Sequence, residues 1–213
     1  MQRGVPDESA TDGVVLIVED DQGMRDALER LFRSVGLQTK LYDSATALEA
    51  AELPDGPCGL VLDVRLPGAS GLDIQKSLLS RGINLPLIFM TGYGDIPMSV
   101  RAMKSGAQDF LVKPFRDQDM LDAVAAALSN DRERREADGA KKDIRRRYET
   151  LTPRESEVMA HVTAGLMNKQ IAGELDLSEI TVKIHRGKVM KKMAARSLAD
   201  LVRMAELLKA GEG

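Results

Sequence analysis

The chain has 213 residues, of which 43% are hydrophobic, 30% are charged and 3% are aromatic. A chain of this length forms one or two domains with a substantial core, which excludes a peptide hormone or a disulfide-stapled miniprotein. Its longest apolar runs are too short to span a bilayer, and the first 13 residues do not resemble a secretory signal. The single cysteine, Cys58, excludes a disulfide framework and a cysteine-built metal site. We therefore expect a cytoplasmic protein without a membrane partner.

The charged residues are unevenly distributed along the chain. Residues 1–128 contain 12 basic and 19 acidic residues, whereas residues 129–213 contain 18 basic and 14 acidic residues. This asymmetry predicts two modules, at residues 13–128 and 150–213, of which the second can face a polyanion. The intervening residues 129–149 are highly charged and nearly free of large apolar side chains. They are predicted to form a linker, either solvated helix or flexible coil, with its break at Asp138-Gly139.

Apolar β-branched runs alternate with segments of helical periodicity in the first module. In chain order, we expect a strand at Val14–Val18, a helix around Met24–Val35, a strand at Gln38–Tyr42, a short helix at Ala45–Ala51 capped by Asp43 or Ser44, a strand at Gly59–Asp63, a helix at Gly71–Leu79, a strand at Leu85–Met90, a helix at Ile96–Ser105, a strand at Gln108–Val112 and a last helix from about Arg116. Five such units predict an α/β fold with an open, doubly wound parallel sheet in the order 2-1-3-4-5 and helices on both faces.

Polar residues that can bind a metal ion or take part in a reaction follow four of these strands. Glu19 and Asp20 follow the first strand, Asp63 ends the third, Thr91 follows the fourth and Lys113 follows the fifth. In the order 2-1-3-4-5 the first and third strands are neighbours, so the acidic pair approaches Asp63. Two carboxylates ~4 Å apart repel by about 4 kcal/mol at an effective dielectric constant of ~20. Three of them in one crevice therefore require a cation, and all-oxygen ligands suit Mg²⁺.

The same four strand ends can support phosphoryl transfer. The carboxylate of Asp63 can act as the nucleophile, while the cation and Lys113 offset the charge that develops on the phosphoryl oxygens. Each feature also has a simpler interpretation: an acidic pair after a strand is commonly a helix cap, and Asp63 or Lys113-Pro114 alone can be a turn. Their joint placement at four strand ends favours the functional interpretation.

Residues 13–128 resemble the receiver domain of two-component response regulators. The resemblance is carried by VVLIVEDD, LVLDVRLPGASGLD, FMTGYGD and DFLVKPF. It implies that Asp63 is the phosphoacceptor, that Mg²⁺ is held by Glu19, Asp20, Asp63 and the backbone carbonyl of Arg65, that Thr91 and Lys113 bind the phosphoryl oxygens, that Phe110 is an aromatic switch, and that the Lys113-Pro114 bond is cis.

The second module is predicted to be all helical. Thr152-Pro153-Arg154-Glu155 is a capping box whose helix ends near Gly165, Asn168 caps a short helix, Asp176-Leu177 makes a turn, Ser178 caps a third helix that ends at about Met193, and a fourth covers about Ser197–Lys209. The third helix carries five basic residues and one acidic residue. On charge alone it could be a solvated basic face, but two helices around a turn are also a helix-turn-helix candidate.

The stretch LTPRESEVMAHVTAGLMNKQIAGELDLSEITVKIHRGKVMKKM is similar to the LuxR-type DNA-binding domain. The match covers about residues 149–210, and both halves of the chain together resemble the FixJ subfamily of response regulators. The resemblance implies that Lys183 and Ile184 face base edges and that Thr181, Arg186, Lys188 and Lys191 lie near phosphates. His185 could contact phosphate or pack between helices.

These features together predict a transcription factor that is switched by phosphorylation. A sensor histidine kinase would phosphorylate Asp63, the protein would dimerise through the Ile96–Ser105 helix and the strand-five surface, and the dimer would bind promoter DNA and RNA polymerase. The protein would not be an enzyme apart from its own phosphorylation and dephosphorylation. Two alternatives are an aspartate-nucleophile phosphatase, which would lack a carboxylate two residues after Asp63 where Arg65 stands, and a module that signals by protein contacts alone.

Overall fold

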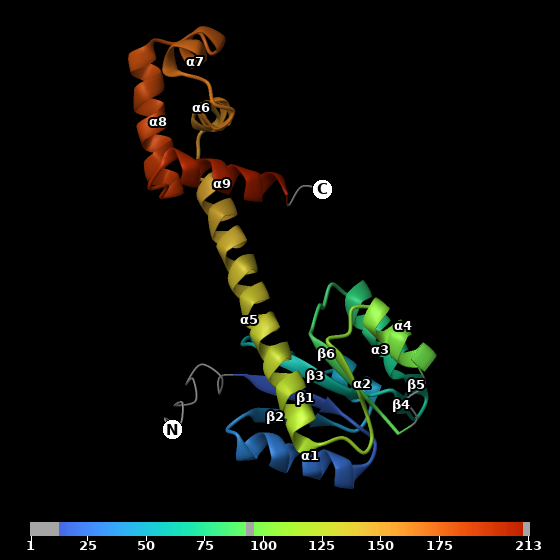
Figure 1. The fold of residues 1–213 in the computed structure, drawn as a ribbon. Coiled ribbons are helices and arrows are strands. Elements are labelled where there is room, and N and C mark those ends of the chain that lie inside the picture. The colour runs from blue at the N-terminus through green and yellow to red at the C-terminus, as the bar shows by residue number, and fades with distance from the viewer. Residues whose placement is uncertain (1–12, 93–95, 211–213) are drawn as a thin grey trace. The chain divides into compact units, whose positions relative to one another are not determined.

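The computed structural model describes residues 13–92 and 96–210 and divides into two compact units, one ending at Arg135 and the other beginning at Glu136 (Figure 1). The first 12 residues, which make up most of the N-terminal segment that does not resemble a secretory signal, lie outside the described residues. Within the described ranges, none of the helices is both long enough and apolar enough to cross a membrane.

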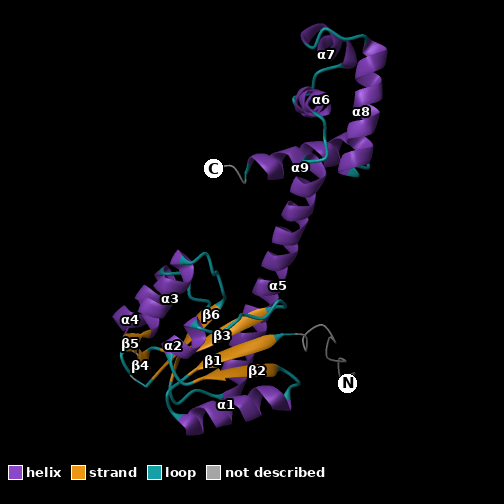
Figure 2. Cartoon of the chain, turned by 180° about the vertical axis from the view of Figure 1, so that it is seen from behind, coloured by secondary structure: helices purple, strands orange, loops and turns teal. Residues whose placement is uncertain are grey.

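The N-terminal unit is built on a parallel sheet with five strands, shown as arrows in Figure 2. The strands are β1 (Val14–Val18), β2 (Gln38–Tyr42), β3 (Cys58–Asp63), β6 (Leu87–Thr91) and β7 (Asp109–Val112), in the order β2-β1-β3-β6-β7. This is the predicted doubly wound order, and it confirms the predicted fold class. Because all five strands are parallel, their carboxyl ends share one edge of the sheet.

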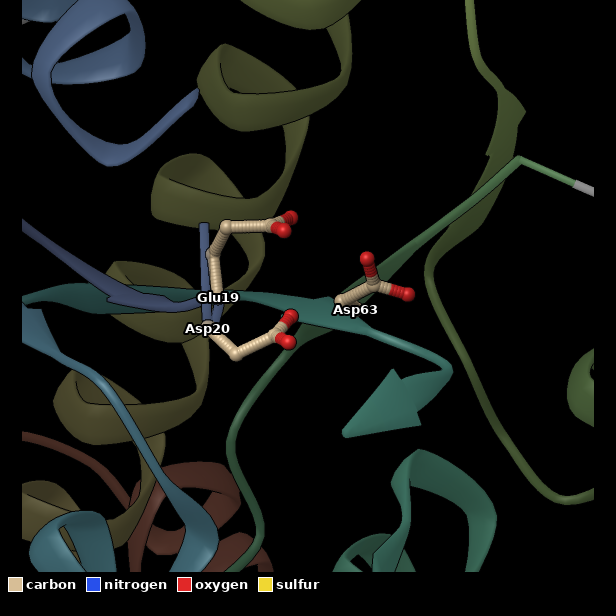
Figure 3. A group of neighbouring side chains, drawn as sticks. All are labelled: Glu19, Asp20 and Asp63. Atoms are coloured by element: carbon tan, nitrogen blue, oxygen red, sulfur yellow. The ribbon is translucent and has the colours of Figure 1, made fainter. Parts of the chain in front are cut away.

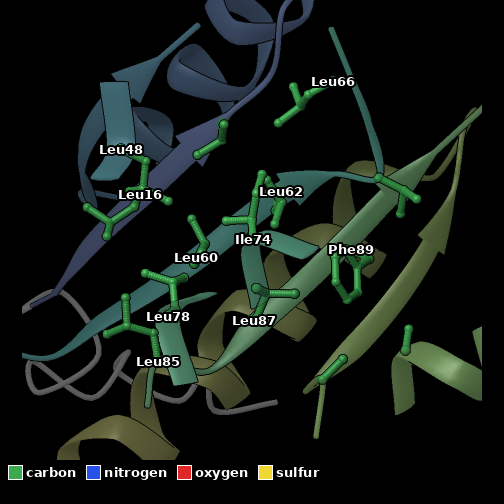
Figure 4. Packing of buried hydrophobic residues seen from close by; sticks show 14 of the residues in the cluster. Leu16, Leu48, Leu60, Leu62, Leu66, Ile74, Leu78, Leu85, Leu87 and Phe89 are labelled. Carbon is green, nitrogen blue, oxygen red and sulfur yellow. The ribbon is translucent and has the colours of Figure 1, made fainter. Parts of the chain in front are cut away.

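Helices cover both faces of this sheet. They are α1 (Gln22–Ser34), α2 (Ala45–Glu49), α3 (Gly71–Ser80), α4 (Ile96–Lys104) and the first part of α5 (Asp117–Tyr148). Successive residues of a strand point to opposite faces, so β1 sends Leu16 into the core with α2, α3 and α4 (Figure 4) and Ile17 into the core with α1 and α5. Both faces are therefore apolar, as the unbroken apolar runs predict.

A two-residue strand pair was not expected from the sequence. Strand β4 (Arg65–Leu66) pairs antiparallel with β5 (Ala69–Ser70) directly after β3. The turn between them contains Gly68 with a φ of 77°, a conformation that glycine adopts without steric cost. This hairpin shapes the loop that follows Asp63.

The expected break at Asp138-Gly139 is wrong, because α5 continues through both residues to Tyr148. Ala137, Ala140 and Lys141 around them are strong helix formers, and a single glycine in such a run costs only about 1 kcal/mol.

The segment is also not uniformly solvated. Asp131 is fully buried within the N-terminal unit, and Ile144 is buried in the core of the C-terminal unit.

The C-terminal unit contains four further helices, α6 (Pro153–Thr163), α7 (Asn168–Glu174), α8 (Glu179–Met193) and α9 (Leu198–Lys209). The predicted capping box is present: the N–H of Glu155 donates to Thr152 Oγ1 (3.3 Å), and the N–H of Thr152 donates to Glu155 Oε2 (2.9 Å). Asn168 is the first helical residue rather than the cap. The cap is Met167, whose N–H donates to Gln170 Oε1 (2.8 Å).

Candidate functional site

An acidic pocket lies where β1 and β3 end. Carboxylate oxygens of Glu19, Asp20 and Asp63 all lie within 4.8 Å of one another (Figure 3). Glu19 and Asp63 are buried, at 2% and 6% exposure, whereas Asp20 is exposed. The structure therefore brings together the three side chains that the strand order predicts to be neighbours.

The three acidic residues after β1, Glu19, Asp20 and Asp21, have two different roles. Asp21 caps α1, because its Oδ1 accepts a hydrogen bond from the N–H of Met24 (2.7 Å). The helix-cap interpretation thus applies to Asp21 and leaves the side chains of Glu19 and Asp20 for the pocket. Arg25, one turn into α1, donates from one guanidinium nitrogen to the backbone carbonyls of Glu19 (2.5 Å) and Asp20 (2.8 Å). These bonds fix the backbone from which both carboxylates extend.

Lys113 joins two of the carboxylates. Its Nζ lies 2.5 Å from Glu19 Oε2 and 2.6 Å from Asp63 Oδ2. The other oxygen of Asp63 accepts a hydrogen bond from the N–H of Arg65 (2.8 Å). Lys113 follows β7 directly, and its peptide bond to Pro114 is cis, as the resemblance implies. Asp63 is thus held from two sides, by an ammonium and by a backbone donor.

The pKa values in the pocket reflect burial and the charged neighbours of each group. Burial raises the pKa of Glu19 above its ordinary value, the hydrogen bond from Lys113 opposes this, and the neighbouring Asp63 adds to it. For Lys113, burial alone would lower the pKa, but hydrogen bonds to Asp63 and Glu19 raise it above its ordinary value. Three carboxylates against one ammonium leave two negative charges, so a divalent cation with a preference for oxygen fits this donor set.

The two further residues that the resemblance implies, Thr91 and Phe110, lie on the neighbouring strands β6 and β7. Thr91, the last residue of β6, is fully buried, and its carbonyl accepts a hydrogen bond from the N–H of Lys113 (2.7 Å). Phe110 on β7 is half-buried, and its ring centroid lies 6.5 Å from that of Phe89, with the ring planes tilted by 56°. The backbone bond connects the strand end that carries Thr91 to the residue that holds Asp63.

A second candidate surface is the outer face of α8. Val182 and Val189 are buried in the core of the C-terminal unit, while Lys183, Lys188 and Lys191 are exposed. Ile184 is also exposed, at 54%. Thr181 is half-buried at the start of the helix, where its N–H donates to Ser178 Oγ (3.1 Å). The helix therefore offers a basic face to solvent.

Arg186, which the resemblance places near phosphate, has a partner within the protein. It is half-buried, and its guanidinium donates to Asn168 Oδ1 at the start of α7 (3.1 Å). His185 is half-buried as well, and among the described atoms its Nδ1 is buried without a hydrogen-bond partner. This environment favours a packing role for His185. Lys192 is bound within the protein, to Glu155 Oε2 (2.5 Å) and the carbonyl of Thr150 (2.9 Å).

Sequence reasoning missed two sets of contacts. One is Arg25, whose position one turn after the acidic loop is the only sequence signal for its bonds to the loop carbonyls. The other is a buried cluster in which Asp131 accepts hydrogen bonds from the N–H of Cys58 (2.9 Å), from Arg135 Nε (2.6 Å) and from Arg134. Arg135 also donates to the carbonyl of Asp55 (2.7 Å). An Asp with Arg at the third and fourth following positions was the available signal.

Comparisons with known proteins match two separate parts of the chain to two families. The family model described as "Response regulator receiver domain" matches residues 15–125, and that described as "Bacterial regulatory proteins, luxR family" matches residues 149–205. Nodulation protein W of Bradyrhizobium diazoefficiens is 58% identical over 206 residues, covering 97% of this chain and 91% of that protein. The transcriptional regulatory protein FixJ of Rhizobium meliloti is 45% identical over 197 residues, covering 92% of this chain and 96% of that protein.

Two solved structures of response regulators are also similar to this chain over most of its length. The response regulator StyR is similar with a TM-score of 0.83 at 43% identity, covering 92% of this chain and 98% of that chain. Full-length FixJ from B. japonicum is similar with a TM-score of 0.55 at 38% identity, covering 93% of this chain and 98% of that chain.

Proposed function

Because the chain belongs to the FixJ-type response regulators, which join a receiver domain to a LuxR-type DNA-binding domain, we propose that phosphorylation of Asp63 controls its binding to promoter DNA. The observation that carries the proposal is the position of Asp63, buried at a strand end between the Lys113 ammonium and the Arg65 N–H. We assign residues 13–128 to the receiver, 129–149 to the linker and 150–213 to the DNA-binding domain.

Phosphoryl transfer at this site begins with a carboxylate oxygen of Asp63. The oxygen attacks the phosphorus of a phosphohistidine in a sensor histidine kinase, the P–N bond breaks, and an acyl phosphate forms on Asp63. With a small donor such as acetyl phosphate, the P–O bond breaks and acetate leaves. Lys113 and the hydroxyl of Thr91 bind the phosphoryl oxygens, and later hydrolysis of the acyl phosphate restores the carboxylate. This self-directed chemistry is the extent of the catalysis that we propose.

Magnesium is the cation that best fits the pocket. Glu19, Asp20, Asp63 and the backbone carbonyl of Arg65 would hold it, and it would supply charge compensation for the phosphoryl oxygens. The carboxylate cluster supports this assignment, since its ligand atoms lie within 4.8 Å of one another.

The proposed response to phosphorylation runs through Thr91 and Phe110 to α4 and β7. A phosphoryl group adds a charge of about −1.5 to −2, which would draw the Thr91 hydroxyl inward and let the half-buried Phe110 follow. The surface of α4 and β7 supports a role in dimerisation, because Val100, Met103 and Val112 are 44%, 47% and 48% exposed. Burial of these side chains against a second copy would stabilise the phosphorylated dimer.

The outer face of α8 is the proposed DNA contact. Lys183 and Ile184 would face base edges, and Thr181, Lys188 and Lys191 would lie near phosphates. Arg186 would reach a phosphate from its position beside Asn168. A dimer on promoter DNA would then recruit RNA polymerase in the cytoplasm.

The other interpretations explain less of the chain. An aspartate-nucleophile phosphatase leaves the LuxR-type domain without a role, and the residue two positions after Asp63 is Arg65, whose N–H binds Asp63. A module that signals only by protein contacts leaves the buried carboxylates of Glu19 and Asp63 without a role.

A gel-shift experiment with and without acetyl phosphate and Mg²⁺ separates the three interpretations. We expect promoter DNA to be shifted at lower protein concentration with the donor, and Asp63→Asn to abolish that difference. A phosphatase would release phosphate in many turnovers without a shift, and a protein-contact module would show neither result. Equal shifts with and without the donor would contradict the proposal.

A further inference from the structure

Two isoleucines and a glycine lie on the side of α8 that faces solvent. Ile180 and Ile184 are 74% and 54% exposed, and residues four positions apart on a helix are neighbours on one face. Gly187 and Lys191 continue the same line at spacings of three and four residues, and both are exposed. Ile180, Ile184 and Gly187 are called the apolar ridge below.

The apolar ridge lies on the side of α8 that is turned away from the core. Val182 and Val189, which are 0% and 1% exposed, lie on the opposite side of the helix. Lys183 and Lys188 flank the ridge, and both are exposed. A cationic partner surface is therefore disfavoured, and a polyanion that also offers small apolar groups is favoured.

The major groove of DNA meets both requirements. Its phosphates attract the flanking lysines, and the thymine C5-methyl group is the apolar group that it presents to a recognition helix. We propose that Ile180 and Ile184 select thymine at two positions of the operator by contacting the C5-methyl groups in the major groove. This inference rests on the proposed function and adds the base that the apolar ridge recognises.

Gly187 would allow the DNA to come close to the backbone of α8 along the apolar ridge. A Cβ at this position would have no described neighbour within 4 Å, and its φ is not in the left-handed region. The fold therefore does not require glycine there, and an alanine would form a helix more readily by about 1 kcal/mol. The missing side chain leaves room between Ile184 and Lys191 for the floor of the groove.

The test uses the full-length protein with acetyl phosphate and Mg²⁺. Selection from a random duplex library first gives the preferred sequence, and duplexes are then made with deoxyuridine in place of each thymine, which removes only the C5-methyl group. We expect a loss of about fourfold in affinity at each of two positions per half-site, the factor that follows from burial of one methyl-sized group.

Variants assign these positions to side chains. For Ile184→Ala, deoxyuridine in place of thymine at one of the two positions should no longer weaken binding. For Ile180→Ala, the substitution at the other position should no longer weaken it. Gly187→Ala should keep its fold and lose affinity on every duplex. Leu79→Ala is the matched control, because Leu79 is an exposed apolar residue of α3 (46%), and it should behave as the unsubstituted protein.

The possible outcomes separate the two proposals. If the deoxyuridine duplexes bind the unsubstituted protein as well as the thymine duplexes do at all positions, the thymine proposal is wrong while the proposed function stands. The thymine proposal is also wrong if both isoleucine variants lose as much affinity on the deoxyuridine duplexes as the unsubstituted protein does. The apolar ridge would then serve a protein partner. If no duplex is enriched, the proposed function fails and this inference fails with it.

Discussion

The ammonium of Lys113 lies 2.5 Å from Glu19 Oε2, although 94 residues separate the two along the chain. The same nitrogen lies 2.6 Å from Asp63 Oδ2. One side chain therefore connects the carboxyl ends of β1 and β3 and the loop after β7. The ammonium already compensates part of the charge on the two buried carboxylates, which leaves Asp20 as the exposed carboxylate of the pocket.

Replacement of the proposed nucleophile gives the first prediction. Asp63→Asn keeps the shape of the side chain but removes the attacking oxygen charge, so the variant should not be labelled by radioactive acetyl phosphate and should not dimerise on addition of the donor. Circular dichroism should show an intact fold. Labelling of another aspartate at normal stoichiometry in this variant would show that the assignment is wrong.

The second prediction concerns the metal. Glu19 is buried and bound to Lys113, whereas Asp20 is exposed. Asp20→Ala should therefore weaken Mg²⁺ binding and slow phosphorylation more than Glu19→Ala does. Calorimetric titration of Mg²⁺ into the unphosphorylated forms of the unsubstituted protein and the two variants measures this difference without reference to activity. Equal Mg²⁺ affinities for all three would refute the acidic pocket as the cation site.

The third prediction uses two aspartates of the same helix. Asp131 is fully buried and is bound by Arg134 and Arg135, while Asp143 is about half exposed and pairs with Arg146 (2.9 Å). Asp131→Ala should lower the free energy of unfolding of the N-terminal unit by about 1–3 kcal/mol, because the buried N–H of Cys58 loses its acceptor and two partly exposed guanidinium groups lose their partner.

Asp143→Ala is the control for this experiment. It should change the free energy of unfolding by less than about 1 kcal/mol, since exposed ion pairs contribute little. Urea unfolding followed by circular dichroism compares the two variants. Equal effects would show that burial of Asp131 does not stabilise the fold.

The fourth prediction is a pH dependence at the start of α6. Hydrogen bonds from Lys192 and from the N–H of Thr152 lower the pKa of Glu155 from 4.5 to about 2. A carboxyl whose pKa is lower in the folded state contributes stability above the unfolded value of 4.5, and this contribution is lost between pH 4.5 and about 2.

Glu155→Gln isolates that contribution, because glutamine can still accept the capping bond. At pH 7 it should lower the stability of the C-terminal unit by about 2 kcal/mol, and the difference from the unsubstituted protein should narrow below pH 4.5. Thermal unfolding at several pH values measures it. Glu157→Gln is the control, because Glu157 is 49% exposed, and its effect should be small. A Glu155→Gln difference that is constant with pH would contradict the ion pair.

The fifth prediction separates phosphate contacts from base contacts on α8. Lys191→Ala should weaken binding about equally on all DNA sequences and reduce the salt dependence by about one unit. Lys183→Ala should instead relax sequence specificity at a cost of about 1–3 kcal/mol. Binding to a panel of operator variants at several salt concentrations measures both. An unchanged specificity profile for Lys183→Ala would mean that a different face of the helix enters the groove.

The sheet and its acidic edge were predictable because their signals are local and repeated. Apolar runs such as Val14–Val18 alternate with helical periodicity, and the topology rules for parallel sheets leave few possible strand orders. Once the order is known, the acidic residues after β1 must approach Asp63. The capping box at Thr152 was equally predictable, since it depends on residues three positions apart.

Other contacts depend on partners that are distant in sequence. Asp131 stands in a run of charged residues that is typical of a solvated helix, and nothing in that run indicates the N–H of Cys58, which is 73 residues away. Arg186 similarly bonds to Asn168 across two helices. The sequence predicts a break at Gly139 because glycine is a weak helix former, but the helix-forming residues on both sides carry α5 through it.

The hydrogen bond from Cys58 to Asp131 has a consequence for variation in this protein. The donor belongs to the backbone, so every residue type except proline can supply it at position 58. The thiol fills a buried space and accepts a weak hydrogen bond from Arg135 (3.5 Å), so a substitution there has to fill that space and leaves this one bond unmade. Position 131 has no such freedom, because its side chain accepts bonds from the backbone and from two arginines. Related chains can therefore differ at residue 58 and still keep the hydrogen bond that attaches α5 to β3. Asp131, in contrast, should stay the same in such chains, although the charged residues around it vary.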